Sequence, residues 1–365
     1  MKSRGMVVAF SIVTFFLGPM SLHFLKPTYR RLYQGINFRL RTFASGRYAS
    51  ACRPTSIAIL LTERCNARCI HCDIWKNKGS ERAVELETWK KLLNDLRDWL
   101  GPVHIVLSGG EALLKRFTID LVEYGSSLGL FIELLTHGFW DDQSKFVRLA
   151  LAKPGRVTFS FDGIGETHNL IRGRDHFFEK TSNSIQTLNR VKKEHSLNFV
   201  IRLKTVVMDQ NLNDLCKVAE YAALHDLEVF YQPIEQNYNT EEDPRWFEKS
   251  NTWPKESHRA VAAVKDLIRL KENGLPIANS INQLEAMIPY FQDPAKWRIA
   301  TQAHSAHERS FLCSALTTLQ VQADGGVTTC TMQPVIGNLL ERPIRELWES
   351  RPQWWIQGCC LERRS

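Results

Sequence analysis

The sequence predicts an α/β fold in which a parallel sheet curls into a full or partial barrel. Short apolar runs typical of strands alternate with longer amphipathic stretches typical of helices, from residue 56 to residue 234. Strands joined by helices imply parallel pairing, because a helical crossover returns the chain to the same end of the sheet. Barrels of this kind carry their functional residues at the carboxyl ends of the strands.

The first predicted strand is residues 56–62 (SIAILLT), and leucines at helical spacing follow it over residues 82–100. Five further strand-like runs follow along the chain, at 104–108, 130–136, 156–162, 198–207 and 228–234. We therefore expect six parallel strands. A later helix is predicted at about 256–272.

We expect four regions in the 365-residue chain. They are an N-terminal apolar segment with a basic linker (1–50), the barrel core (51–235), an insertion with bridging helices (236–300) and a small C-terminal unit (301–365). The C-terminal unit is expected to form a β-hairpin around the turn ADGG and then a helix around RPIRELWES.

The insertion begins with a stretch that breaks the alternation through proline, acidic residues and aromatic residues. Its aromatic side chains are Tyr238, Trp246, Phe247 and Trp253. They either line a substrate pocket or pin the loop to the core.

Composition excludes several classes of protein. The formal net charge is +8, yet no Lys/Arg block is long enough for a nucleic-acid arm, so no nucleic-acid partner is expected. Apolar residues make up 44% of the chain, which argues against long disordered stretches. The nine cysteines are too sparse for a disulfide scaffold, and their clustering indicates soft-metal ligation in a reducing compartment.

Residues 5–25 contain no Lys, Arg, Asp or Glu and are close to the ~20 residues that span a bilayer. The heavier positive flank follows this segment, which would leave the rest of the chain in the cytosol. We therefore expect a cytoplasmic catalytic domain anchored to the inner face of the membrane. A helix lying on the membrane surface and a helix packed on the domain are the alternatives.

Three cysteines follow the first predicted strand in the pattern C-x3-C-x2-C, at Cys65, Cys69 and Cys72. A structural zinc would take a fourth Cys or His nearby, and His71 adjoins Cys72 too closely to ligate beside it without strain. A four-iron cluster held by three thiolates leaves one iron open. The motif therefore favours an iron–sulfur cluster whose open iron binds a cofactor.

The run CNARCIHC, together with LSGGEALL at residues 107–114, resembles the radical S-adenosylmethionine (radical SAM) superfamily. The resemblance implies a partial (β/α)6 TIM-like barrel with a [4Fe–4S] cluster on the three cysteines and S-adenosylmethionine chelated to the open iron. It implies that Ser108, Gly109, Gly110 and Glu111 lie against the methionine ammonium, with the glycines allowing close approach of the backbone.

Other positions extend the resemblance. His71 stands where the family commonly has an aromatic residue near the adenine. The run SFDGIGETHNLIRG resembles a segment of the peptide- and cofactor-maturing branch, in which the residues matching Ser160 and Arg172 contact the ribose and the carboxylate. Arg202 on the fifth strand is a further carboxylate partner or, alternatively, a surface cation.

A second cysteine group lies near the C-terminus. Cys313, Gly325 and Cys330 form C-x11-G-x4-C, and Cys359 and Cys360 follow. This pattern resembles the SPASM/twitch extension of radical SAM enzymes and implies one auxiliary iron–sulfur cluster, with these four cysteines as candidate ligands. Free thiols or a zinc staple are the alternatives.

The resemblance implies an enzyme that reductively cleaves S-adenosylmethionine to a 5′-deoxyadenosyl radical. The radical would abstract hydrogen from a peptide, a cofactor precursor or another natural product, with electrons from a flavodoxin- or ferredoxin-type donor. A membrane lipid or lipid-linked substrate is an alternative suggested by the N-terminal segment. A non-catalytic iron–sulfur scaffold or sensor and a zinc-binding module are alternatives from other classes.

Overall fold

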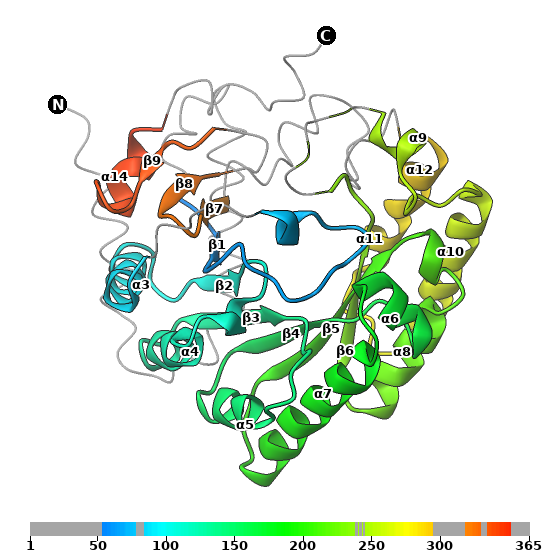
Figure 1. Cartoon of the computed structure of the whole chain (residues 1–365), viewed down its shortest axis with the longest axis horizontal. Helices are drawn as coiled ribbons and strands as arrows, with labels where there is room; N and C mark the ends of the chain where they lie inside the picture. Colours follow the sequence, from blue (N-terminus) through cyan, green and yellow to red (C-terminus); the bar gives the residue numbers. More distant parts are fainter. Residues whose placement is uncertain are drawn as a thin grey trace, which may run out of the picture.

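The computed structural model describes residues 53–77, 84–237, 240, 243, 245–294, 318–329 and 334–351. Within them, six parallel strands pair in chain order and form a curved sheet (Figure 1). These strands are β1 (Ser56–Leu60), β2 (His104–Ser108), β3 (Phe131–Thr136), β4 (Arg156–Ser160), β5 (Val200–Val207) and β6 (Glu228–Pro233). The predicted α/β partial barrel is confirmed.

Helices cover the outer, convex face of this sheet (Figure 1). They are α3 (Leu86–Leu100), α4 (Thr118–Ser127), α5 (Ser144–Leu151), α6 (Glu166–Arg172), α7 (Phe177–Glu194) and α8 (Leu215–Leu224). The helices after β6 are α9 (Trp246–Lys249), α10 (Ser257–Glu272), α11 (Ile281–Glu285) and α12 (Met287–Gln292). Single 3-10 turns lie at Ile74–Lys76, Ala112–Leu114 and Asp209–Asn211.

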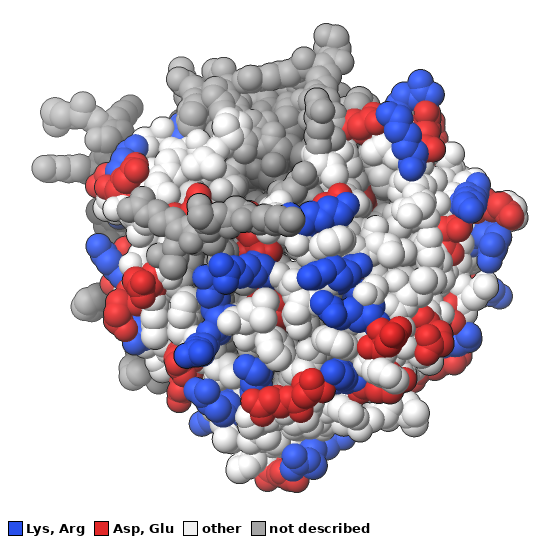
Figure 2. Space-filling view, viewed as in Figure 1, with Lys and Arg blue, Asp and Glu red and all other residues white. Residues whose placement is uncertain are grey.

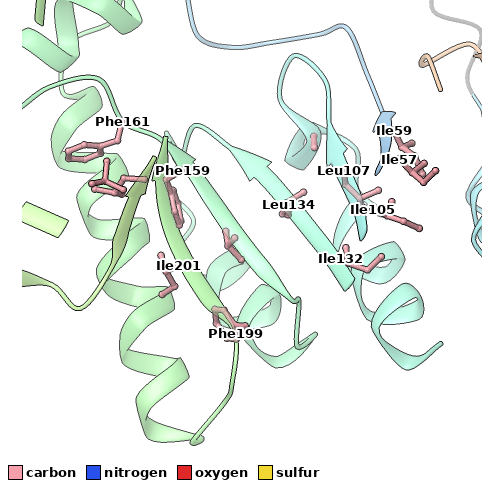
Figure 3. Packing of buried hydrophobic residues seen from close by; sticks show 14 of the residues in the cluster. Ile57, Ile59, Ile105, Leu107, Ile132, Leu134, Phe159, Phe161, Phe199 and Ile201 are labelled. Atoms are coloured by element: carbon pink, nitrogen blue, oxygen red, sulfur yellow. The ribbon is translucent and has the colours of Figure 1, made fainter. Parts of the chain in front are cut away.

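Alternation along the strands separates an apolar face from a more polar one. Ile57, Leu107 and Leu134 belong to the buried core packed between the sheet and its helices (Figure 3). The intervening residues are less buried and face the concave interior; on β5 these include Arg202 and Lys204. The fold therefore leaves its interior face available for polar side chains.

The C-terminal hairpin continues the barrel sheet. Its strands are β7 (Thr318–Val321), β8 (Gly326–Thr328) and β9 (Gly337–Asn338). β7 pairs in parallel with β1, and β8 pairs antiparallel with β7 across a turn in which Gly325 has a φ of 89°. The helix α14 (Ile344–Glu349) then packs on α3, where the Trp348 and Trp99 ring centroids lie 6.5 Å apart. The predicted hairpin and helix are therefore present, while the boundaries of the four regions stay predictions.

The aromatic residues of the insertion pin it to the core. The Trp253 ring lies 5.5 Å from Trp246 and 5.4 Å from both Tyr290 and Phe291 of α12. Phe247 packs 5.7 Å from Trp253. This packing indicates that these aromatic residues pin the loop to the core and favours that role over lining a substrate pocket. Tyr238 lies outside the described residues.

Lys and Arg side chains gather near the middle of the face shown in Figure 2, with Asp and Glu side chains among and below them. Positive charge on this face is therefore interleaved with negative charge. No helix among the described residues is long and apolar enough to cross a membrane. Residues 5–25, the predicted membrane-associating segment on which the lipid-substrate alternative depends, lie outside them.

A buried polar network holds the strands together near their amino ends. The carboxylate of Glu133 lies 2.7 Å from His104 Nε2 and 3.3 Å from Arg156 Nη1, and it accepts a 2.6 Å hydrogen bond from Thr158 Oγ1. Burial acts to raise the pKa of Glu133, but the His104 hydrogen bond and the Arg156 charge outweigh it and lower the pKa to about 2.

Glu133→Gln is expected to lower the free energy of unfolding by about 2 kcal/mol at pH 7, because a charge-assisted hydrogen-bonding centre is lost. The folded-state pKa of Glu133 lies below its ordinary value of 4.5, so its contribution is full above pH 4.5 and is lost as the pH falls toward 2. Urea unfolding at several pH values should show the gap between wild type and variant closing below pH 4.5. A difference in the free energy of unfolding that stays constant below pH 4.5 would contradict the stabilising role of the ionised Glu133 carboxylate.

Candidate active site

The loop after β1, residues 61–77, carries the three cysteines and is called here the cysteine loop. It is bound on one side to the end of α6. The amide of Arg68 donates to the Arg172 carbonyl at 3.0 Å, and the amide of Ile70 donates to the Ile171 carbonyl at 3.0 Å. The loop thus spans from β1 to the segment after β4, across the concave side of the sheet (Figure 1).

The turn after β2 holds the other side of the cysteine loop. The amide of Gly110 donates to the Thr62 carbonyl at 2.7 Å. A Cβ on Gly109, which has a φ of 140°, would lie 2.2 Å from Thr62 O, and one on Gly110 would lie 2.3 Å from Arg64 O. Both glycines are thus required for close packing of two backbone segments. Their predicted approach to the cofactor, like that of Ser108 at the end of β2, stays a prediction.

Glu111 is buried and satisfied by protein groups. Its Oε1 accepts hydrogen bonds from the Leu113 amide at 3.1 Å and from Thr136 Oγ1 at 2.8 Å, and its Oε2 accepts from the His137 amide at 2.9 Å. The carboxylate thus joins the carboxyl ends of β2 and β3. Its predicted contact with the methionine ammonium stays a prediction.

His137 is a site residue that the sequence analysis missed. Its Nδ1 accepts from the Phe139 amide at 2.9 Å, which assigns the proton to Nε2. Nε2 lies 2.7 Å from Asn66 Oδ1, in the cysteine loop, and 3.2 Å from Glu111 Oε2. Burial lowers the pKa of His137, so a neutral imidazole links the Glu111 carboxylate to the cysteine loop. The position of His137 at the end of the third strand was the signal that could have identified it.

The three thiols lie in an apolar shell. Cys65, Cys69 and Cys72 pack with Ala67, Phe139 and Phe177. Burial raises the pKa of Cys65 to about 12 and also raises the pKa of Cys69 and Cys72. Burial therefore favours the neutral thiols, and a bound cation would favour the thiolates.

The three thiols on the cysteine loop are the side chains that could hold a cluster of several irons. Among the described residues, no group of three or more His, Cys, Asp or Glu side chains is gathered tightly enough to hold one metal ion. In a four-iron cluster each thiolate binds a different iron, so the sulfurs need not meet at one point. Arg172 Nη1 donates to Cys69 Sγ at 3.5 Å, the kind of hydrogen bond that tunes such a cluster.

A buried ion pair lies beside the thiols. Arg172 Nη2 is 2.5 Å from Asp162 Oδ2, and Asp162 Oδ1 accepts from the Val206 amide at 2.9 Å. Burial acts to raise the pKa of Asp162, and the Arg172 charge holds it below its ordinary value. Nearby, burial lowers the pKa of His71 to about 4, and its buried Nδ1 has no hydrogen-bond partner among the described residues. His71 is thus a neutral, unsatisfied imidazole, while its predicted place beside the adenine stays a prediction.

The remaining predicted residues separate into two groups. Ser160 ends β4 and is half-buried on the interior face, whereas Arg202 is paired at 2.5 Å with Glu228, the first residue of β6. Arg202 does not lie opposite Ser160. The residue in register with Ser160 is Lys204, two residues further along β5. Contact of Ser160 or Arg202 with the cofactor stays a prediction. The predicted auxiliary ligands Cys313, Cys330, Cys359 and Cys360 lie outside the described residues.

Comparison with known proteins identifies the family. The profile of the Radical SAM superfamily matches residues 59–222, which include the cysteine loop and the glycine turn. Residues 59–222 of the chain form a radical SAM domain. This radical SAM enzyme is 28% identical over 306 residues to the AdoMet-dependent heme synthase of Methanosarcina barkeri, covering 81% of this chain and 82% of that protein.

Two further radical SAM relatives cover different amounts of the chain. The sporulation killing factor maturation protein SkfB of Bacillus subtilis is 28% identical over 47% of this chain, but the match spans only 40% of SkfB. The structure of Streptococcus suis SuiB bound to the precursor peptide SuiA has a TM-score of 0.62 at 14% identity, covering 84% of this chain and 67% of SuiB. The SuiB comparison supports the fold of this radical SAM enzyme.

Gly173→Ala is expected to remove more than half of the iron from the reconstituted enzyme. Gly173 has a φ of 68°, and its added Cβ would lie 2.2 Å from the Arg68 carbonyl, so the cysteine loop would have to move. Gly129→Ala is the matched control, because Gly129 has a φ of 76° with nothing within 4 Å of the added Cβ. Both variants bear backbone strain of about 1 kcal/mol or more. Equal iron content in the two variants would contradict this role for Gly173.

Proposed function

We propose that this radical SAM enzyme abstracts a hydrogen atom from a peptide or a cofactor precursor held at the carboxyl ends of its strands. The observation that carries the proposal is that the cysteine loop, with its three thiols, contacts both the turn at Gly109 and Gly110 and the segment of the Arg172–Asp162 pair. A heme synthase and a peptide maturation protein among the relatives support this substrate class.

Cys65, Cys69 and Cys72 would hold the [4Fe–4S] cluster that the family implies. When bound, the cluster and S-adenosylmethionine supply reductive cleavage and a 5′-deoxyadenosyl radical. The protein's own residues bind, orient and exclude water. Arg172 supplies positive charge and a hydrogen bond at Cys69, and Phe139 and Phe177 shield the thiols from solvent.

The C-terminal unit would carry an auxiliary iron–sulfur cluster on Cys313, Cys330 and one or both of Cys359 and Cys360. The hairpin β7–β8 before Cys330 and the SPASM-type relatives support this assignment. We also propose a flavodoxin- or ferredoxin-type electron donor. We further propose a reducing, cytoplasmic location, because the clustered cysteines are typical of metal ligation and not of a disulfide framework.

Anaerobic reconstitution with iron and sulfide tests the proposal. Wild type is expected to hold about eight irons and the Cys65/Cys69/Cys72→Ala triple variant about four, as for two four-iron clusters. Cys216→Ala is the matched control, because Cys216 is a half-buried thiol on α8, outside the cysteine loop. Only wild type and the control should form 5′-deoxyadenosine with dithionite. Cleavage by the triple variant would contradict the assignment of the cysteine loop, and four irons in wild type would contradict the auxiliary cluster.

A further inference from the structure

Lys204 is a cation on the interior face of the barrel. It is half-buried on the interior face of β5, in register with Ser160 of β4 and Phe230 of β6. Among the residues that the structure describes, its ammonium has no hydrogen bond and no ion pair. Burial lowers the pKa of Lys204, although the charges of Glu133, Glu235 and Asp162 oppose this effect.

The other cations of the interior already have partners. Arg202 is paired with Glu228 at 2.5 Å, Arg156 with Glu133 at 3.3 Å and Arg172 with Asp162 at 2.5 Å. The acidic groups near Lys204 are thus engaged by these arginines, except Glu235. An enclosed ammonium without a counter-ion is costly, and proteins normally compensate such a charge with an anion.

Glu235 lies close enough to Lys204 for their charges to interact. It follows β6 and is exposed to solvent, yet desolvation raises the pKa of its carboxyl group, an effect that the Lys204 charge opposes. Lys204 itself is half-buried, so part of its side chain stays accessible to a ligand inside the barrel, next to Phe230 of β6.

We propose that Lys204 binds a carboxylate group of the substrate, within the reaction assigned to this enzyme under the proposed function. A carboxylate matches the compact charge of an ammonium and would complete the pairing of the interior cations. The substrate class that fits is a carboxylate-bearing tetrapyrrole, since the heme synthase relative aligns over 81% of this chain. The half-buried Phe230 ring, over which the Arg202 guanidinium lies 5.8 Å from the ring centroid, adds apolar surface beside the cation.

Heme and heme dimethyl ester are the probes, because they differ only in their free carboxylates. Their dissociation constants for the anaerobically reconstituted enzyme are measured from the Soret band. Wild type is expected to prefer heme over the ester by about tenfold to a hundredfold, the size of a charge-assisted hydrogen bond. Lys204→Met should remove this preference, and Lys204→Arg should retain most of it. Lys217→Met is the control, since Lys217 is an exposed lysine paired with Asp214 at 2.7 Å.

The carboxylate of S-adenosylmethionine is the competing source. Equilibrium dialysis with S-adenosylmethionine and its decarboxylated analogue measures how far Lys204 recognises the cofactor. If Lys204→Met removes only the preference for S-adenosylmethionine over its decarboxylated analogue, Lys204 binds the carboxylate of the cofactor. The proposal is then overturned. It is equally overturned if wild type does not distinguish heme from its ester, or if Lys204→Met preserves the heme preference.

Urea midpoints confirm that each variant is folded. Formation of 5′-deoxyadenosine is measured separately, and its absence in wild type would contradict the proposed function without deciding the role of Lys204.

Discussion

Arg172→Met is expected to lower the free energy of unfolding by about 3 kcal/mol, because it leaves the buried Asp162 carboxylate without its counter-charge. The variant should also lose most S-adenosylmethionine cleavage, since Cys69 Sγ would lose its guanidinium donor. Urea unfolding and the yield of 5′-deoxyadenosine measure the two effects. Arg172→Lys keeps the charge but loses the planar guanidinium with its two donor nitrogens. This variant should therefore be closer to wild type in stability than in S-adenosylmethionine cleavage.

A second substitution separates the two roles of Arg172. Asp162→Asn combined with Arg172→Met leaves no buried charge unpaired, so the double variant should regain part of the stability that Arg172→Met loses. It should not regain cleavage, because the hydrogen bond to Cys69 is still absent. Recovery of both properties would mean that Arg172 acts only as the partner of Asp162. An Arg172→Met variant as stable as wild type would contradict the buried ion pair itself.

The strands could be predicted because their side chains alternate between two environments. The run at 198–207 contains Ile201, Leu203, Thr205 and Val207 at every second position, and the observed strand is Val200–Val207. The cysteine loop and the glycine turn were found for a different reason. Their residue types are rare, and their spacing is dictated by the cluster and by close backbone packing.

Contacts between distant segments could not be predicted from the same patterns. The pairing of β7 with β1 joins segments more than 250 residues apart, as in Ser56 opposite Thr318, and no local feature of either strand specifies its neighbour. The two interior cations of β5 also look alike in the sequence. Only the register shows that Glu228 lies opposite Arg202 while Phe230 lies opposite Lys204. Within the part of the chain that the structure describes, Arg202 is therefore paired and Lys204 is not.

Glu111→Gln is expected to lower the free energy of unfolding by about 3 kcal/mol and to reduce iron content after reconstitution. Three donors converge on the buried carboxylate, from the Leu113 amide, Thr136 Oγ1 and the His137 amide. A glutamine would place its NH2 group against at least one of these donors and leave it unsatisfied, which costs about 1 to 3 kcal/mol for each buried group. Glu123→Gln, at an exposed position of α4, is the control and should be neutral.

Asn66→Ala tests whether the effect of Glu111 on iron passes through His137. This substitution removes the acceptor of the His137 Nε2 hydrogen bond but leaves the Glu111 carboxylate and its three donors in place. The fold should therefore keep nearly its full stability, while the cysteine loop loses its anchor to β3 and the enzyme holds less iron. If Asn66→Ala retains all its iron while Glu111→Gln loses it, Glu111 acts through the turn at Gly109 and Gly110 and not through His137. The two variants thus decide which of the two contacts at the ends of β2 and β3 holds the cysteine loop in position.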